Sequence, residues 1–176
     1  MGFGPVIATA MSVIVLLAAG YMLVSGITNS SDTTGMALKE ASDRHLQQEN
    51  TLLTIGNLSG NRTSGYLTFN LNNAGNEKID NVSQIDVIVK FTNPDESWWC
   101  PNQAPGAGSA GPYWTCVQIT SVTPGIGDSI NPGMLDPGET MLIEVVNASA
   151  FPSNNVWVQA TAPDGASATY LWTINN

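Results

Sequence analysis

The chain has 176 residues, a formal net charge of −9 at pH 7, and charged side chains at only 11% of its positions. Nucleic-acid binding needs a positive surface for phosphate groups, so this charge argues against nucleic acid and equally against electrostatic docking on anionic lipid. About 125 residues follow residue 50, which is enough for one hydrophobic core but not for two.

The first element is an apolar segment that contains no charged side chain before Asp32. Its twenty residues from Pro5 to Val24 make a helix that spans a hydrocarbon core of roughly 30 Å. A secretory signal peptide has a shorter apolar core that follows Lys or Arg. Cleavage within "LLAAGY" therefore stays as an alternative, and we predict a transmembrane anchor over residues 1–27.

The second element follows the anchor directly. Ser30, Ser31 and Asp32 are residues that cap helix starts, and "MALKEASDRHLQQEN" is rich in helix formers. The apolar stripe on this helix is irregular, so we predict a helical stalk over residues 28–50 with little core contact. His45 lies within this stalk, where we expect a solvated position and no catalytic or ligand role.

From Thr51 the pattern changes to short segments rich in β-branched and aromatic residues, with partial alternation. Turn sequences separate these segments; in "PDG", for example, Asp164 and Gly165 suit a tight reversal. Seven strands without intervening helices predict an all-β, immunoglobulin-like β-sandwich over residues 51–176. The predicted strands are 51–55, 65–72, 85–91, 113–122, 140–146, 156–162 and 168–174.

The two cysteines, Cys100 and Cys116, enclose a segment rich in proline and glycine. Two thiols without a nearby histidine do not make a zinc site, so we expect neither a metal nor a cofactor here. A disulfide that closes this loop is the first interpretation, and two unrelated buried thiols are the second. A disulfide requires an oxidising compartment outside the membrane.

Five N-x-Ser/Thr sequons agree with an extracytoplasmic domain. Lys39 and Arg44 follow the anchor while no basic residue precedes it, which points to the opposite orientation. We give the cysteines and the sequons more weight and place the amino terminus inside and the domain outside. The candidate glycosylation sites are Asn29, Asn57, Asn61, Asn81 and Asn147.

The sequence contains no catalytic constellation, and we predict that the protein is not an enzyme. Asp128, Asp136 and Glu139 match no calcium-binding loop, so we predict no metal site there. Aromatic residues flank the cysteines instead. Core or disulfide-shielding residues are the first interpretation for them, and a recognition patch for a partner is the second. These residues are Trp98, Trp99, Tyr113 and Trp114.

Several stretches resemble the F-type accessory protein of the archaellum, the archaeal flagellum. They are "MGFGPVIATA" running into an apolar helix, "ASDRHLQQENTLLTI", "LTFNLNNAGNEKI" and "LDPGETMLIEV". The Cys100–Cys116 segment departs from that family. The resemblance implies a stator component with its helix in the cell membrane through residues 5–24 and its sandwich outside. There it would bind the surface-layer protein and other archaellum components.

Two other classes remain as alternatives. The first is an archaellin or type IV pilin-like filament subunit, which shares the plan of apolar helix, continued helix and β-domain, and which would be an extracellular filament. Such precursors carry a basic residue before the helix, and pilins usually a glutamate early within it, whereas residues 1–31 contain neither. The second is an anchored ectoenzyme. Self-association into a homo-oligomer is open in every case.

Overall fold

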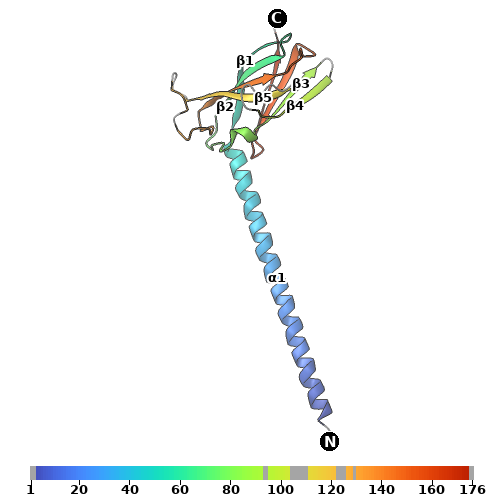
Figure 1. Ribbon diagram of the computed structural model, residues 1–176. Coiled ribbons are helices and arrows are strands. Elements are labelled where there is room, and N and C mark those ends of the chain that lie inside the picture. The colour runs from blue at the N-terminus through green and yellow to red at the C-terminus, as the bar shows by residue number, and fades with distance from the viewer. Residues whose placement is uncertain (1–2, 93–94, 104–110, 122–125, 129, 175–176) are drawn as a thin grey trace. The chain divides into compact units, whose positions relative to one another are not determined.

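The computed structural model describes residues 3–92, 95–103, 111–121, 126–128 and 130–174. The chain divides into two compact units, Met1–His45 and Leu46–Asn176. The first unit is helical, and the second contains eight β-strands and the last turn of the helix (Figure 1).

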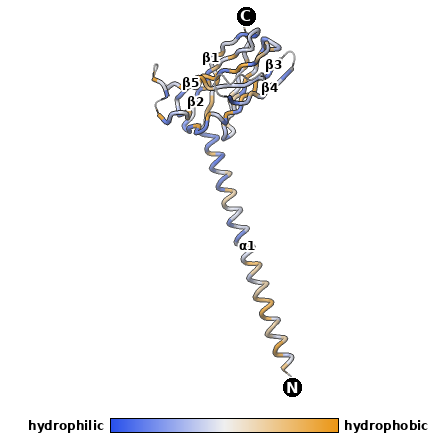
Figure 2. The backbone as a smooth tube through the Cα atoms, in the orientation of Figure 1, coloured by the Kyte–Doolittle hydropathy of each residue, from blue (hydrophilic) through white to orange (hydrophobic). Residues whose placement is uncertain are grey.

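Helix α1 (Gly4–Asn50) is one continuous element of 47 residues. Pro5 lies in its first turn, where its missing N–H costs nothing. In the apolar part the hydroxyls bond to backbone carbonyls four residues earlier, as in Thr9 to Pro5 (3.0 Å) and Ser12 to Ala8 (2.9 Å). These bonds satisfy the Thr9 and Ser12 hydroxyl donors within the helix itself. Figure 2 shows the change from apolar to polar residues along the helix.

The prediction of a new helix start at Ser30–Asp32 is wrong, because residues 28–34 are already helical. The Thr28, Thr33 and Thr34 hydroxyls each donate to the carbonyl four residues earlier, at 2.8 to 2.9 Å. Hydroxyls that donate to the carbonyl four residues earlier lie inside a continuing helix and do not cap a helix start. The anchor and the stalk are therefore parts of one helix.

The strands form two four-stranded antiparallel sheets, which confirms the predicted sandwich. The first sheet has the order β1-β2-β6-β5, and the second has the order β4-β3-β7-β8. β1 lies next to β8 across the sandwich, and β4 next to β5. The strands are β1 (Leu53–Asn61), β2 (Tyr66–Asn73), β3 (Asp86–Thr92), β4 (Asp95–Cys100), β5 (Tyr113–Thr120), β6 (Thr140–Val146), β7 (Asn155–Thr161) and β8 (Ser167–Thr173).

The core lies between the two sheets and follows from the alternation of the strands. In β2 the fully buried apolar residues are Leu67, Phe69 and Leu71, and the residues between them are polar. Val87 and Val89 of β3 make the facing layer from the second sheet. A short 3-10 helix, Val82–Gln84, leads into β3.

β4 is a strand that the sequence analysis did not predict. Its pairing with β3 runs from Asp95 opposite Thr92 to Cys100 opposite Val87. It forms one edge of the second sheet. The sequence "DESWWC" does not alternate between apolar and polar residues, so it shows no strand period. Pairing with β3 forms the strand in spite of this, which is an effect of tertiary context on local pattern.

Candidate interaction surface

The outer faces of the two sheets differ in chemistry. On the first sheet the outer face carries polar side chains of β1 and β2, such as Thr54, Thr68 and Asn72. Asn72 accepts a hydrogen bond from the Thr140 hydroxyl (2.8 Å) and donates to the Thr54 hydroxyl (3.3 Å). Such a face is well solvated and needs no partner.

The outer face of the second sheet carries four large apolar side chains among polar and charged ones, since Ile88 lies opposite Gln159 and Trp157 opposite Lys90. Strand register places Ile88 of β3 opposite Trp99 of β4, and Trp157 of β7 opposite Leu171 of β8. Trp99 and Leu171 expose 61% and 67% of their surface, while Ile88 and Trp157 are half-buried. We call these four residues the apolar face. Aromatic and aliphatic side chains that reach the surface on all four strands of a sheet are typical of a protein-contact surface.

The adjacent residues Trp98 and Trp99 have opposite roles. The Trp98 ring packs edge-on against Phe91, with centroids 4.7 Å apart, and lies 5.9 Å from the Phe151 ring. Trp98 Nε1 donates to Glu96 Oε1 (2.6 Å). Trp99 points to the other side of β4, where its Nε1 lies 3.3 Å from Asp86 Oδ1. Trp98 is therefore mainly a core residue, and Trp99 belongs to the surface.

The partner-contact interpretation does not hold for Tyr113 and Trp114, which are 8% and 0% exposed. The segment after β4 explains their burial, because it crosses to the first sheet and pairs with β5. The Trp114 N–H donates to Pro101 O (3.0 Å), and the Gln103 N–H donates to Trp114 O (2.9 Å). Of the predicted loop, residues 104–110 lie outside the described residues.

Both cysteines are free thiols in the structure, so the predicted disulfide is not formed in it. Cys100 lies opposite Val87 in the second sheet, and Cys116 lies opposite Ile143 in the first. Burial raises the pKa of Cys100 to about 12. Burial, with the charge of Asp128, also raises the pKa of Cys116. The alternative of two separate buried thiols fits this arrangement better.

The sequons differ in accessibility. Asn29, Asn57, Asn61 and Asn81 are exposed. The Asn81 side chain accepts hydrogen bonds from the N–H (3.1 Å) and the hydroxyl (2.6 Å) of Ser83, which leaves its amide nitrogen facing outward from the turn. Asn147 is 8% exposed, and its Nδ2 donates to Ser149 O (3.1 Å). A glycan on Asn147 does not fit the folded domain.

The acidic residues near β6 stabilise a turn. Asp136 accepts from Asn131 Nδ2 at 3.1 and 3.2 Å, and Glu139 accepts from the Asp136 N–H at 3.0 Å. The Asp128 carboxylate accepts from the Gly133 N–H (2.7 Å). Among the residues that the structure describes, no group of three His, Cys, Asp or Glu is arranged to hold a metal ion.

The first residues of the β-sandwich unit are held by hydrogen bonds and close packing. The last helical turn, from Leu46 to Asn50, belongs to this unit. Asn50 O accepts from the Asn76 N–H (2.8 Å), and Gln48 Nε2 donates to Gly165 O (3.3 Å). Gly75 packs so closely that a Cβ on it would lie 2.4 Å from Asn50 O. Two loops of the sandwich therefore hold this turn.

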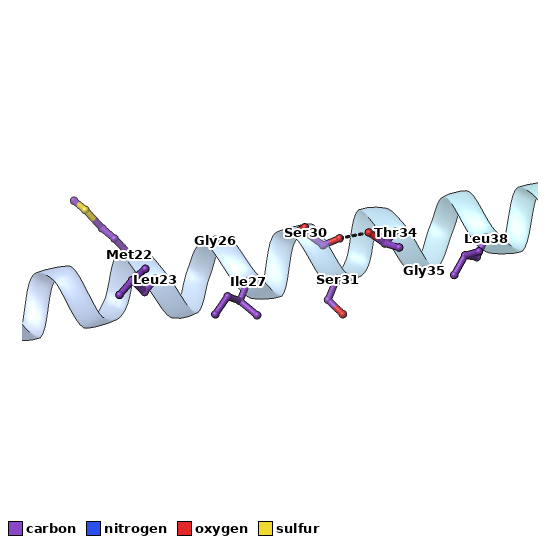
Figure 3. Close-up of a pocket in the computed structure, with 9 residues that line it drawn as sticks. All are labelled: Met22, Leu23, Gly26, Ile27, Ser30, Ser31, Thr34, Gly35 and Leu38. Atoms are coloured by element: carbon purple, nitrogen blue, oxygen red, sulfur yellow. Dashed lines mark hydrogen bonds between the residues drawn. The ribbon is translucent and has the colours of Figure 1, made fainter.

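The first unit contains one helix that is long and apolar enough to cross a membrane, by length and composition. A shallow groove follows one side of it between Met22 and Leu38 (Figure 3). The groove is present because Gly26 and Gly35 have no side chains to fill the space between their larger neighbours. The Thr34 hydroxyl donates to Ser30 O (2.8 Å). We assign no ligand to this groove.

Sequence reasoning missed Trp157 and Leu171 as surface residues. Both lie in segments that were correctly predicted as strands, but only Trp157 sits between buried neighbours, since Tyr170 beside Leu171 is exposed. For Trp157 the signal was present, because an apolar residue at the outward position of an alternating strand is unusual. The sequence did not show that β3, β4, β7 and β8 share one sheet.

Comparison with known proteins adds a family and a fold. The sequence matches the archaeal-type flagellin family over residues 2–172. The structure is similar to the archaellum periplasmic stator protein FlaG from Sulfolobus acidocaldarius, with a TM-score of 0.50 and 22% identity over 69% of this chain and 99% of that chain. It is also similar to a chain of the FlaF–FlaG stator complex from the same organism, with a TM-score of 0.50 and 19% identity over 68% and 87%. No curated protein sequence matches the chain.

Proposed function

The chain belongs to the archaeal-type flagellin family, and from this premise we propose that it is a membrane-anchored stator component of the archaellum. The family match bears out the resemblance to an archaellum protein. The observation that carries the stator proposal is the likeness of the fold to stator structures, which extends over 99% of the FlaG chain.

The anchor is residues 5–24 of α1, in a cell membrane that the chain crosses once. We propose the division predicted from the sequence: an anchor over residues 1–27, a helical stalk over 28–50 and the sandwich over 51–176. The sandwich lies outside the cell, in the archaeal pseudoperiplasm. The exposed sequons support this orientation, since they belong to an extracytoplasmic surface.

The partner of the sandwich is the surface-layer protein. One apolar helix retains a protein in the bilayer but does not fix it laterally, because lipid is fluid. A stator must resist force, so its fixation comes from a rigid structure outside the membrane. The apolar face is the surface on this chain that suits such a contact. Since FlaF and FlaG form a complex, other archaellum components are further partners.

The role is structural and not enzymatic. Both similar structures are stator proteins, and the buried acidic and polar side chains near β6 bond within their own turn. The hydrogen bonds that hold the turn Leu46–Asn50 also support a stator role. A domain that must resist force needs an ordered first segment.

Deletion of the gene, followed by filament imaging and motility assays, tests this proposal. We expect filaments that assemble poorly or do not rotate, and protein that fractionates with the cell envelope. A pull-down of isolated surface-layer protein by the full chain in detergent tests the partner, with a surface-layer-free envelope fraction as the control. No enrichment over that control contradicts surface-layer binding while leaving the archaellum role intact.

The second candidate is a filament subunit; the family description names flagellin, but the likeness to stator structures does not favour this candidate. This candidate predicts that the protein is the repeating unit of sheared filaments and that its amino terminus is shortened by processing. Mass spectrometry of sheared filaments separates the two. Recovery of this chain as the main filament component replaces the stator proposal.

A further inference from the structure

The outer face of the second sheet mixes large apolar side chains with polar ones in adjacent positions. Strand register places Trp99, Ile88, Gln159 and Thr169 in one row across the four strands, and Ser97, Lys90, Trp157 and Leu171 in the next row. The core of a protein–protein interface is depleted of charged residues, so this mixture is unusual for one. A sugar presents apolar C–H groups and hydroxyl groups together, and therefore matches both kinds of side chain.

Trp99 exposes 61% of its surface, yet one edge of its ring is held in place. Its Nε1–H donates to Asp86 Oδ1 (3.3 Å) on the neighbouring strand β3. The face of an aromatic ring is weakly negative and attracts the weakly positive C–H groups of a sugar. A ring that is held before the ligand arrives loses little conformational entropy on binding. Trp99 is therefore a preorganised platform for stacking.

Trp157 provides a second ring on the same face. It lies two strands and two residues from Trp99 in the register, which separates their backbones by about 12 Å. This separation exceeds the size of one sugar ring, so an oligosaccharide can contact both tryptophans. Gln159 is the next outward residue on β7, and its Nε2 donates to Thr161 Oγ1 (3.1 Å). That bond orients the Gln159 amide, whose carbonyl oxygen is an acceptor for a sugar hydroxyl.

The charge of this face also suits a neutral ligand. The chain as a whole has a net charge of −9. Among the outward side chains of this sheet that the structure describes, the charged ones are Asp86 and Lys90, one of each sign. An uncharged glycan therefore meets no net repulsion here, whereas the charge of an acidic or basic partner finds no complement.

We propose that this face binds a glycan carried by the surface-layer protein, with Trp99 and Trp157 stacking against sugar rings and Gln159 accepting from a sugar hydroxyl. This inference rests on the proposed function, because it names the chemical group through which the surface-layer protein is bound. The exposed sequons of the chain itself agree with a compartment in which proteins carry N-linked glycans.

The test uses the full chain in detergent, made in cells that do not glycosylate it, so that its own glycans do not compete. The probe is the pool of N-linked glycans released from isolated surface-layer protein by hydrazinolysis, and isothermal titration calorimetry measures the dissociation constant. The variants are Trp99→Leu, which keeps an apolar side chain but removes the ring, and Trp99→Phe, which keeps a ring. The matched control is Tyr66→Leu, because Tyr66 is an exposed aromatic residue on the first sheet. Circular dichroism verifies the folding of each variant.

We expect the wild type to bind the glycan and Trp99→Leu to raise the dissociation constant about tenfold or more. Trp99→Phe and Tyr66→Leu should stay within about threefold of the wild type. Absence of binding to the wild type overturns the inference. So does an unchanged dissociation constant in Trp99→Leu, or an equal loss in Tyr66→Leu.

A second arm separates this inference from the proposed function. The full chain captures surface-layer protein before and after oxidation of its glycans by periodate, which cleaves the vicinal diols of sugar rings. We expect oxidation to abolish the capture. Capture that survives oxidation overturns the glycan inference and leaves the surface-layer partner in place, whereas no capture of the untreated protein contradicts the partner itself.

Discussion

Thr51, the first residue after helix α1, donates its hydroxyl to the carboxylate of Asp164, which lies 113 residues later in the turn between β7 and β8. Thr51 is buried, and its backbone N–H donates to Gln47 O (3.0 Å). A contact between residues so distant in sequence forms only when the last strand pair is in place. The start of the sandwich and its end therefore depend on one another, and the turn at Asp164 has a structural role beyond reversing the chain.

The first prediction concerns this contact. Replacing Asp164 by Ala removes the acceptor of the Thr51 hydroxyl and of the Ala166 N–H, so we expect a loss of about 1–3 kcal/mol in the free energy of unfolding. The matched control is Asp80→Ala, which removes only an exposed pair with Lys78 and should cause no measurable loss. Urea unfolding of the full chain in detergent measures both; equal effects would contradict the role of Asp164.

The second prediction concerns Gly75. An alanine there would place its Cβ 2.4 Å from Asn50 O and 2.5 Å from Leu52 N, both backbone atoms that cannot rotate away. We expect Gly75→Ala to destabilise the domain by about 1–3 kcal/mol through overpacking. Gly56→Ala is the control, since a Cβ at Gly56 meets nothing within 4 Å. A Gly75 variant as stable as the Gly56 variant, by thermal unfolding, shows that the loop moves to make room.

The third prediction is a pH dependence. Burial raises the pKa of the Cys100 thiol from 9.0 to about 12, because the folded domain disfavours the thiolate. The stability from this group is therefore complete below pH 9 and is lost as the pH rises toward 12. Cys100→Ala should flatten the decline of unfolding free energy above about pH 9, relative to the wild type.

Denaturant titrations at several pH values measure that slope, and a thiol assay on the unfolded, non-reduced chain provides the control. We expect two reactive thiols per chain, as the structure has them. Recovery of none would mean that Cys100 and Cys116 are joined, and the disulfide predicted from the sequence would replace the pH prediction.

The fourth prediction concerns glycosylation. In protein from its native cells, we expect glycans on exposed sequons, Asn57 and Asn81 among them, and none on Asn147. Asn147 donates its side-chain amide to Ser149 O and its backbone N–H to Gly65 O, so its nitrogen is held inside the domain. Glycopeptide mass spectrometry reads each site separately. A glycan on Asn147 would contradict the local structure, and bare sequons throughout would remove the support that glycosylation lends to the orientation.

The fifth prediction separates two adjacent tryptophans. Trp99→Ala should change the free energy of unfolding by less than about 0.5 kcal/mol, because the ring lies on the surface, and it should weaken capture of surface-layer protein. Trp98→Ala removes the contacts with Phe91 and Phe151 and should cost about 2 kcal/mol. Unfolding and pull-down assays on the same preparations compare them. If Trp99→Ala binds as well as the wild type, the apolar face is not the contact.

The sequence by itself determined the apolar helix of residues 5–24, which is long enough to cross a membrane, and most of the strands. An uninterrupted apolar run is a local property, and so is the period of two in Leu67, Phe69 and Leu71 or in Val156 and Val158. An uninterrupted apolar run predicts an element that is apolar on every side. A period of two predicts a strand with one buried face. These elements, together with the turns between them, were enough to predict a β-sandwich.

The tertiary structure decided which of these side chains are buried and which are exposed, because local sequence patterns do not contain that information. Trp98 and Trp99 are the same residue type at adjacent positions. Only the pairing of β4 with β3 directs one ring inward and the other outward. The sequence left Trp114 open between a core residue and a contact residue, and in the folded sandwich it is fully buried. The apolar face exists because two strand pairs that are distant in sequence, β3–β4 and β7–β8, join through β3 and β7 into one sheet. The physical reason is that burial depends on neighbours, and neighbours in a sandwich come from long-range pairing.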